Sequence, residues 1–388
     1  MSTSKIVITC SPRIAPHLKK EVEQLGYTVN NTDHQSVELE GTFEDTLRLN
    51  MYLRTANRVL FHLKSFRADH PDQLYSRLKK IAWEEYFDAD GYVSIKSFVN
   101  NKHILDVRFA SLKVKDAIAD RFVEKFGRRP DSGKDLSRTV LFLHWVDEQA
   151  SIYIDTSGET IAKHGYRKIP MKAPMMESLA AATILASRWD FKSHFVNPMC
   201  GSGTLAIEAA LMATQTAPGL SRDNFAFMHV KQYNPEIWEK LKKEASAKIK
   251  KELDFRIIAS DLNAEAVSAA RHNAREAGVS TLIDFQVIDF RHGSVPEDNQ
   301  GVIFMNPEYG QRLGEEQKLL DIYQQIGDFF KNKCQGYMGY IFTGNMNLSK
   351  KIGLKTNRRI EFYNAKIDCR LLEYELYAGS KKNTKLSK

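Results

Sequence analysis

The sequence predicts an α/β protein: a doubly wound sheet in the second half of the chain, preceded by an α+β half. Residues 195–213 indicate a short buried strand, a tight turn at Gly201 and Gly203, and an apolar helix. Residues 255–261 and 301–310 indicate further apolar strands that end in polar residues. A strand, a glycine turn and a helix form a nucleotide-sized crevice at the carboxyl ends of such a sheet. A Cβ on either glycine would collide with a ligand there.

The first half of the chain alternates short strands with helices. Its first 66 residues follow a β-α-β-α-β order, which is typical of a small ferredoxin-like unit, and a second α+β unit follows. The expected strands are 5–10, 36–40, 58–66, 92–98, 140–146 and 151–154, and the expected helices are 14–25, 43–53, 74–83 and 113–126.

The second half supplies the remaining elements of the doubly wound sheet. Residues 214–254 form an insertion, which explains why the strand 255–261 lies far beyond the glycine turn. The expected helices are 173–189, 204–213, 234–251, 263–277 and 315–331, and the further strands are 282–288, 337–343, 360–363 and 367–377.

Composition restricts the class of protein. The 388 residues carry a net charge of +8, and the excess lies after residue 165, partly in a lysine-rich tail. Such a charge permits nucleic acid as a partner without requiring it. The four cysteines are scattered and form no C-x-x-C pair, which argues against a metal site and disulfides and for the cytoplasm. No run of eighteen apolar residues predicts a membrane span, and no apolar signal core follows Met1.

The polar residues at the strand ends suit S-adenosylmethionine. The methionine part of this molecule needs a glycine turn, which Gly201 and Gly203 supply. Its ribose needs an acid, and Asp261 ends the second strand. Its adenine needs a polar contact and an apolar slot, for which we select Asp289 and Phe290. A bound S-adenosylmethionine is therefore the expected cofactor.

The tetrapeptide Asn306-Pro307-Glu308-Tyr309 ends the strand 301–310. It resembles the catalytic motif of methyltransferases that modify exocyclic amines of bases. The lone pair of such an amine is delocalised into the ring. Hydrogen bonds from the NH₂ group to the Asn306 side chain and the Pro307 carbonyl would expose that lone pair, while Tyr309 stacks on the base. Methylation at C5 of a pyrimidine needs a cysteine, and none lies in 301–315.

A longer signature points to one family. Residues 152–167 contain Asp-Thr-Ser-Gly and Lys-His-Gly-Tyr-Arg, and closely resemble a segment of the THUMP-containing 23S rRNA guanine-N2 methyltransferases. The resemblance covers most of the chain. It implies a class I methyltransferase domain at 161–379, preceded by a ferredoxin-like domain at 1–68 and a THUMP RNA-binding domain at 69–160, with a basic tail at 380–388.

The family resemblance also implies the site and the partner. The partner would be RNA, 23S rRNA in particular, with no membrane and no metal involved. The implied catalytic residues are Asn306, Pro307 and Tyr309, and the implied cofactor contacts are Asn197, Pro198, Gly201, Gly203, Thr204, Asp261, Asp289 and Phe290.

Two departures from the family pattern keep other functions open. Asn197 stands where the first motif commonly has Asp, and Glu308 replaces the second proline of the catalytic motif. An RNA-binding protein without activity is therefore one alternative. A DNA adenine-N6 methyltransferase is the other, because the tetrapeptide serves both reactions. We interpret Cys200 as a packing residue and His164 as a loop or hinge residue.

Overall fold

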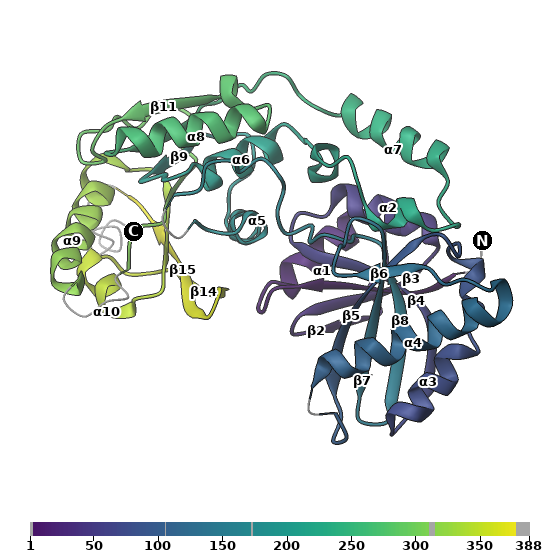
Figure 1. Ribbon diagram of the computed structural model, residues 1–388. Coiled ribbons are helices and arrows are strands. Elements are labelled where there is room, and N and C mark those ends of the chain that lie inside the picture. Colours follow the sequence, from purple (N-terminus) through teal and green to yellow (C-terminus); the bar gives the residue numbers. More distant parts are fainter. Residues whose placement is uncertain (1–2, 105, 172–173, 310–314, 378–388) are drawn as a thin grey trace. The chain divides into compact units, whose positions relative to one another are not determined.

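The structure is a computed structural model that describes residues 3–104, 106–171, 174–309 and 315–377. Its contacts divide the chain into two units (Figure 1). Unit 1 comprises 3–10, Leu18–Ala162 and Arg222–Ala245, and unit 2 comprises Ser11–His17, Lys163–Ser221 and the chain from Ser246 onward. Residues 222–245, which interrupt the second half in sequence, therefore pack with the first half.

Unit 1 is built on one eight-stranded sheet with the order β2-β3-β1-β4-β8-β7-β5-β6. The two α+β units expected from the sequence share this sheet, because β4 pairs antiparallel with both β1 and β8. The strands are β1 (Ser4–Cys10), β2 (Asn31–Asp33), β3 (Ser36–Gly41), β4 (Ala56–Arg67), β5 (Tyr92–Asn100), β6 (Asp131–Gly133), β7 (Thr139–Val146) and β8 (Gln149–Asp155).

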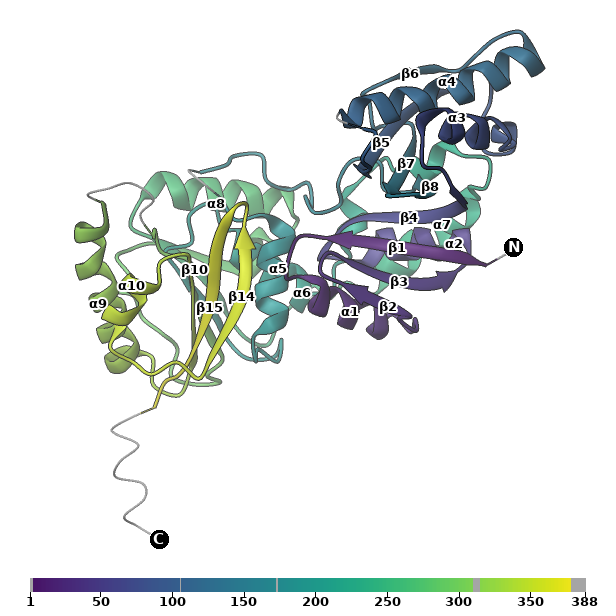
Figure 2. The same cartoon turned by 90° about the horizontal axis from the view of Figure 1, so that it is seen from below.

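Local sequence fixes the ends of the helices around this sheet. Thr42 and Asp45 form a reciprocal capping box at the start of α2. The helix α4 ends at Gly127, whose φ of +69° suits glycine. Figures 1 and 2 show α3 beside α4. The helices are α1 (Ala15–Gln24), which crosses the division between the units, α2 (Phe43–Tyr52), α3 (Pro71–Lys79), α4 (Val107–Phe126) and α7 (Pro235–Ala247), with 3₁₀ turns η1 (Trp83–Glu85) and η3 (Ala226–His229).

Unit 2 contains a seven-stranded sheet with the order β11-β10-β9-β12-β13-β15-β14. The strands from β11 to β13 run parallel, and β15 is antiparallel to both β13 and β14. Figure 2 shows the β14–β15 hairpin in yellow. The strands are β9 (Phe195–Pro198), β10 (Ile257–Asp261), β11 (Ile283–Val287), β12 (Val302–Met305), β13 (Met338–Thr343), β14 (Arg358–Asn364) and β15 (Ile367–Glu375).

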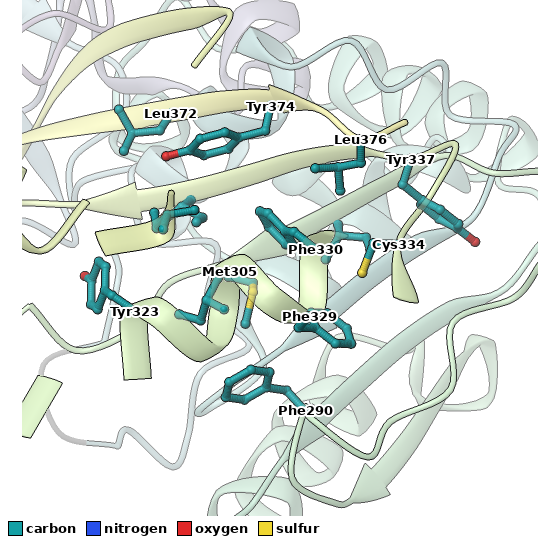
Figure 3. Packing of buried hydrophobic residues seen from close by; sticks show 14 of the residues in the cluster. Phe290, Met305, Tyr323, Phe329, Phe330, Cys334, Tyr337, Leu372, Tyr374 and Leu376 are labelled. Atoms are coloured by element: carbon teal, nitrogen blue, oxygen red, sulfur yellow. The ribbon is translucent and has the colours of Figure 1, made fainter. Parts of the chain in front are cut away.

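Helical segments cover both faces of the unit 2 sheet. On one face Met305 packs with Tyr323 and Phe330 of α9 in a large apolar cluster (Figure 3). On the other face Phe195 stacks on Phe304, and Trp189 packs on Phe195 just after α5. The helices are α5 (Glu177–Ala186), α6 (Thr204–Ala213), α8 (Ala264–Glu276), α9 (Glu315–Lys333) and α10 (Met346–Ser349), with 3₁₀ turns at Pro218–Ser221, Ser280–Leu282 and Lys350–Ile352.

The observed elements confirm the fold class, and several details differ from the prediction. The helix expected at 113–126 begins earlier, at Val107, and the short helix α10 was not predicted. The short strands β2 and β6 were not predicted, because their exposed sequences Asn-Thr-Asp and Asp-Ser-Gly carry no apolar pattern. The helix expected at 173–189 begins at Glu177 and ends at Ala186; residue 173 lies outside the described residues. The helix expected at 74–83 ends at Lys79, and Trp83 lies in η1.

Candidate active site

The turn between β9 and α6 contains two glycines that are needed for two different reasons. Gly201 has a φ of +54° and Gly203 a φ of +83°, values that L side chains rarely adopt. A Cβ on Gly201 would meet no described atom within 4 Å, so open space borders this residue. A Cβ on Gly203 would lie 2.8 Å from the Cβ of Ala270 in α8. The space beside Gly201 is compatible with the predicted ligand, whereas Gly203 is needed for the close approach of α8.

Asp261 links the second strand to the glycine turn. Its Oδ2 accepts the backbone N–H of Gly201 at 3.0 Å, and its Oδ1 accepts that of Asn263 at 3.0 Å. A carboxylate has about four acceptor sites, so two backbone bonds leave capacity for the hydroxyls of a ribose. The half-buried position at the carboxyl end of β10 suits that contact.

Asn197 joins the first strand to the strand of the catalytic motif. Its Nδ2 donates to the Phe304 carbonyl at 2.8 Å, two residues before Asn306. An aspartate at this position could not donate that bond, which gives the departure from the family pattern a structural role here. The Oδ1 of Asn197 is buried and has no donor among the described residues. This oxygen could accept a hydrogen bond from the amino group of a bound S-adenosylmethionine.

The Asn306 side chain carries an unused acceptor. Its Oδ1 is buried without a hydrogen-bond donor among the described residues. A buried acceptor without a partner costs about 1–3 kcal/mol, so such an atom calls for an explanation. An incoming amine would supply the missing N–H. Pro307 is buried immediately after Asn306, and the proline ring fixes the backbone that carries its carbonyl.

Tyr309 is held at both ends of its side chain. Its hydroxyl accepts from Asn364 Nδ2 at 2.8 Å. Its ring lies against Gly344, where an added Cβ would come within 3.2 Å of two ring carbons. Burial raises the pKa of Tyr309 to about 12, so the phenol stays neutral. The ring is therefore fixed in direction beside the end of β12.

Asp289 and Phe290 follow β11 and have separate surroundings. Arg291 donates to Asp289 from its Nε at 2.9 Å, and this contact lowers the pKa of the Asp289 carboxyl. Phe290 lies in the apolar cluster, where its ring packs edge-on against Phe329 at 5.6 Å (Figure 3). Phe290 thus belongs to the apolar core of unit 2, whereas Asp289 is paired with Arg291.

Sequence reasoning missed the role of Arg167. Its guanidinium donates to the Thr204 hydroxyl at 2.9 Å and to the Met175 carbonyl, and it lies 3.5 Å from Glu177. It thereby ties the first residue of α6 to the start of α5. Arg167 ends the Lys-His-Gly-Tyr-Arg run, and that signature was the signal that could have identified it.

His164 lies in a loop as expected, and its side chain is buried. Its Nδ1 is 2.7 Å from Glu208 Oε1 in α6. The Tyr166 hydroxyl donates to the same oxygen at 2.8 Å. Burial, followed by the Glu208 charge, raises the pKa of Tyr166. These contacts fix the segment before Arg167 against α6.

The described residues contain no group of acidic, cysteine and histidine side chains arranged to hold a metal. Cys200 is buried, and burial raises the pKa of its thiol, which agrees with a packing role. No described helix is both long and apolar enough to cross a bilayer.

Comparison with family models identifies the chain. The model of the RMKL-like methyltransferase domain matches residues 164–373, more than half of the chain. A model of the RlmL ferredoxin-like domain matches 5–60, and one of the THUMP domain matches 68–155. The chain belongs to the RMKL-like methyltransferase family, as the sequence predicted.

Individual relatives agree with that assignment. The ribosomal RNA large subunit methyltransferase K/L of Syntrophotalea carbinolica is 35% identical over 96% of this chain. The alignment covers 53% of that relative, and the chain spans about half the length of the first curated relatives that it matches.

Two solved structures share the whole fold. SMU.472, solved in complex with SAH, is 27% identical with a TM-score of 0.86, over 98% of this chain and 99% of that one. A predicted N6-adenine-specific DNA methylase from Listeria monocytogenes is 29% identical with a TM-score of 0.86, over 98% and 97%.

Proposed function

We propose that this protein transfers a methyl group from S-adenosylmethionine to an exocyclic base amine in RNA, namely guanine N2 of 23S rRNA. The buried Oδ1 of Asn306, which has no hydrogen-bond donor among the described residues, carries the proposal. It is an acceptor placed where the family motif engages the target amine. The name of the Syntrophotalea relative supports ribosomal RNA as the substrate.

In this proposal one set of unit 2 residues binds the methyl donor and another set binds the acceptor base. Gly201, Asp261 and Asn197 would hold the donor along the ends of β9 and β10, with Pro198, Thr204, Asp289 and Phe290 as further contacts. S-adenosylmethionine supplies an electrophilic methyl group when it is bound.

The catalytic tetrapeptide would act on the acceptor. Asn306 Oδ1 and the Pro307 carbonyl would accept hydrogen bonds from the two N–H groups of the amine. They would draw its nitrogen toward tetrahedral geometry, which localises the lone pair on that nitrogen. Tyr309 would stack on the base, which must be unpaired or flipped out of its helix. Such a site accelerates the reaction by alignment and oriented dipoles.

This proposal includes a location in the cytoplasm and the four domains predicted from the sequence. Their bounds are 1–68, 69–160, 161–379 and 380–388. The matches of the ferredoxin-like and THUMP models to 5–60 and 68–155 support the first two domains.

The test is methyl transfer from tritium-labelled S-adenosylmethionine onto ribosomal RNA, tRNA and DNA, followed by nucleoside analysis. We expect N2-methylguanosine in 23S rRNA. The description of the Listeria structure as a predicted N6-adenine-specific DNA methylase favours adenine N6 of DNA as the second candidate, and N6-methyladenine in DNA would establish it. Donor binding without transfer to any of the three would instead support the inactive RNA-binding alternative.

A further inference from the structure

Aromatic side chains line up across one face of the unit 1 sheet. His62 on β4 opposes Tyr153 on β8, and their rings meet at 5.3 Å. Tyr153 in turn opposes Phe142 on β7. Lys96 on β5 pairs with Phe142 and ends this row with a cation.

A second row lies beside the first. His144 on β7 sits between Ser151 on β8 and Phe98 on β5. The rings of Phe98 and His144 stack with centroids 5.3 Å apart and planes 11° from parallel. We call the residues of the two rows the aromatic face: His62, Lys96, Phe98, Phe142, His144 and Tyr153.

The helices α2 and α4 pack on the opposite face of the sheet, whereas Ala226 of η3 covers Val140, at one end of the same face as Phe142 and His144. Phe43 of α2 packs edge-on against Phe61, the neighbour of His62 in β4. Ser111 of α4 contacts the hydroxyl of Ser97, the neighbour of Phe98, at 2.7 Å. Because side chains alternate along a strand, the aromatic face points away from both helices. Phe98 is accordingly 53% exposed.

The chemistry of the aromatic face suits bases and phosphates. Burial, followed by the charge of Lys5, lowers the pKa values of His62 and His144. Both rings are therefore neutral at pH 7 and offer flat π surfaces. Lys5 is paired at 3.8 Å with the partly exposed Glu38, a contact of little energetic weight, and Lys96 is exposed. Two cations thus flank a set of rings.

We propose that the aromatic face binds single-stranded RNA, with a base stacked on the Phe98–His144 pair and the backbone beside Lys96. Sequence-tolerant stacking of bases on aromatic residues, combined with lysines along the backbone, is the established mode of single-strand recognition. Beyond its cross-strand pair with His144, an exposed phenylalanine on a sheet face contributes little to the stability of the monomer, and stacking on a base would give it a function. This inference rests on the proposed function in taking RNA as the partner.

The experiment measures binding of the full-length protein to a fluorescent single-stranded RNA of about 12 nucleotides, within the usual site size of such surfaces. Phe98→Ala should weaken the affinity about 5-fold or more through lost stacking, while Phe98→Tyr should retain it. Lys96→Ala should lower the slope of log affinity against log salt by about 1.

Phe109→Ala is the matched control, because Phe109 is 44% exposed but lies on α4. It should leave the affinity unchanged. Equal affinity of wild type and Phe98→Ala, or an equal loss with Phe109→Ala, would overturn the proposal. So would equal competition by duplex RNA, whose bases cannot stack on the protein. Thermal unfolding of each variant checks that the fold is intact.

The methyl transfer assay separates this proposal from the proposed function. If the wild-type protein methylates ribosomal RNA and Phe98→Ala binds RNA normally, the aromatic face is refuted and the proposed function stands. If the wild type methylates no RNA while Phe98→Ala loses binding, the proposed function fails and the aromatic face stands as an RNA-binding surface.

Discussion

The two sheets of this protein differ in how many of their faces are buried. In unit 2 all four residues of β12 are buried, since α9 packs on one face and the segment at Trp189 on the other. In unit 1, β7 buries the side chains directed toward α4, while on the opposite face Val140 is buried under Ala226 and His144 is exposed. A sheet covered on both faces can offer a ligand only the ends of its strands, whereas a sheet covered on one face can offer the face itself.

The largest effect should come from a residue between the layers of unit 2. Phe304 is fully buried and stacks between Phe195 and Tyr340, with centroids at 5.4 and 4.7 Å. Phe304→Ala should destabilise unit 2 by about 3–5 kcal/mol. Phe98→Ala, on the exposed face of unit 1, should change stability by less than about 0.5 kcal/mol. Hydrogen exchange of β12 and β5 peptides measures both, and similar costs would remove the contrast between the sheets.

Asn306→Ala tests whether the chemistry lies at a strand end. Removing one aligned dipole typically lowers a rate about 10²–10³-fold, so methyl transfer should fall by that factor. Binding of S-adenosylhomocysteine should persist, because Asn306 would contact the acceptor. Asn347→Ala, which changes an exposed asparagine of the same unit, is the control and should retain full activity. An active Asn306→Ala variant would show that this strand end is only a turn.

Asp261→Ala tests the proposed S-adenosylmethionine site at the carboxyl end of β10. It would remove the ribose contact and the acceptor for the Gly201 N–H. Binding of S-adenosylhomocysteine should weaken by about 1–3 kcal/mol, as expected for a hydrogen bond to a charged group. Calorimetry gives the dissociation constant. An unchanged constant in a folded variant would exclude Asp261 from the donor site.

Tyr309 tests capture of the acceptor base. Tyr309→Ala should weaken RNA capture by about 1–3 kcal/mol of lost stacking. Tyr309→Phe keeps the ring but loses the bond from Asn364, so its effect should be milder. Asn364→Ala should match Tyr309→Phe in the Michaelis constant for RNA. If Tyr309→Phe is as damaging as Tyr309→Ala, the hydroxyl rather than the ring matters.

The smallest effect concerns an ion pair of unit 1. Arg121 and Lys125 contact Glu84 at 2.7 and 2.6 Å and hold the pKa of its carboxyl well below the usual value. The resulting stabilisation is present above the unfolded pKa of about 4.3 and is lost as pH falls through the lower folded value. Glu84→Gln should lower the free energy of unfolding by no more than about 1 kcal/mol at neutral pH. It should also weaken the fall of that free energy with decreasing pH. Fluorescence of the adjacent, buried Trp83 follows unfolding. An unchanged pH dependence of stability below about pH 5 would contradict the role of this ion pair.

The sequence determined the fold class and the family. The strand, turn and helix around Gly201 and the tetrapeptide at Asn306 depend on local patterns, because apolar runs, glycines and proline act on their own stretch of chain. The structure agrees with the expected limits of most helices and strands. The roles of the individual site residues remain predictions, and the experiments above test them.

Only the tertiary structure shows which polar groups of the site already have a partner within the protein and which glycines are needed for packing. Asn197 bonds to the Phe304 carbonyl, Arg167 spans from Thr204 to Met175, and Gly203 is required by Ala270 of another helix. Each of these contacts, except that of Arg167 with Met175, joins residues that are far apart in sequence. The sequence also could not show which face of the unit 1 sheet carries the exposed aromatic residues. Strand alternation shows that two faces exist but not which of them α2 and α4 cover. That choice depends on packing between elements, which no single stretch of sequence encodes.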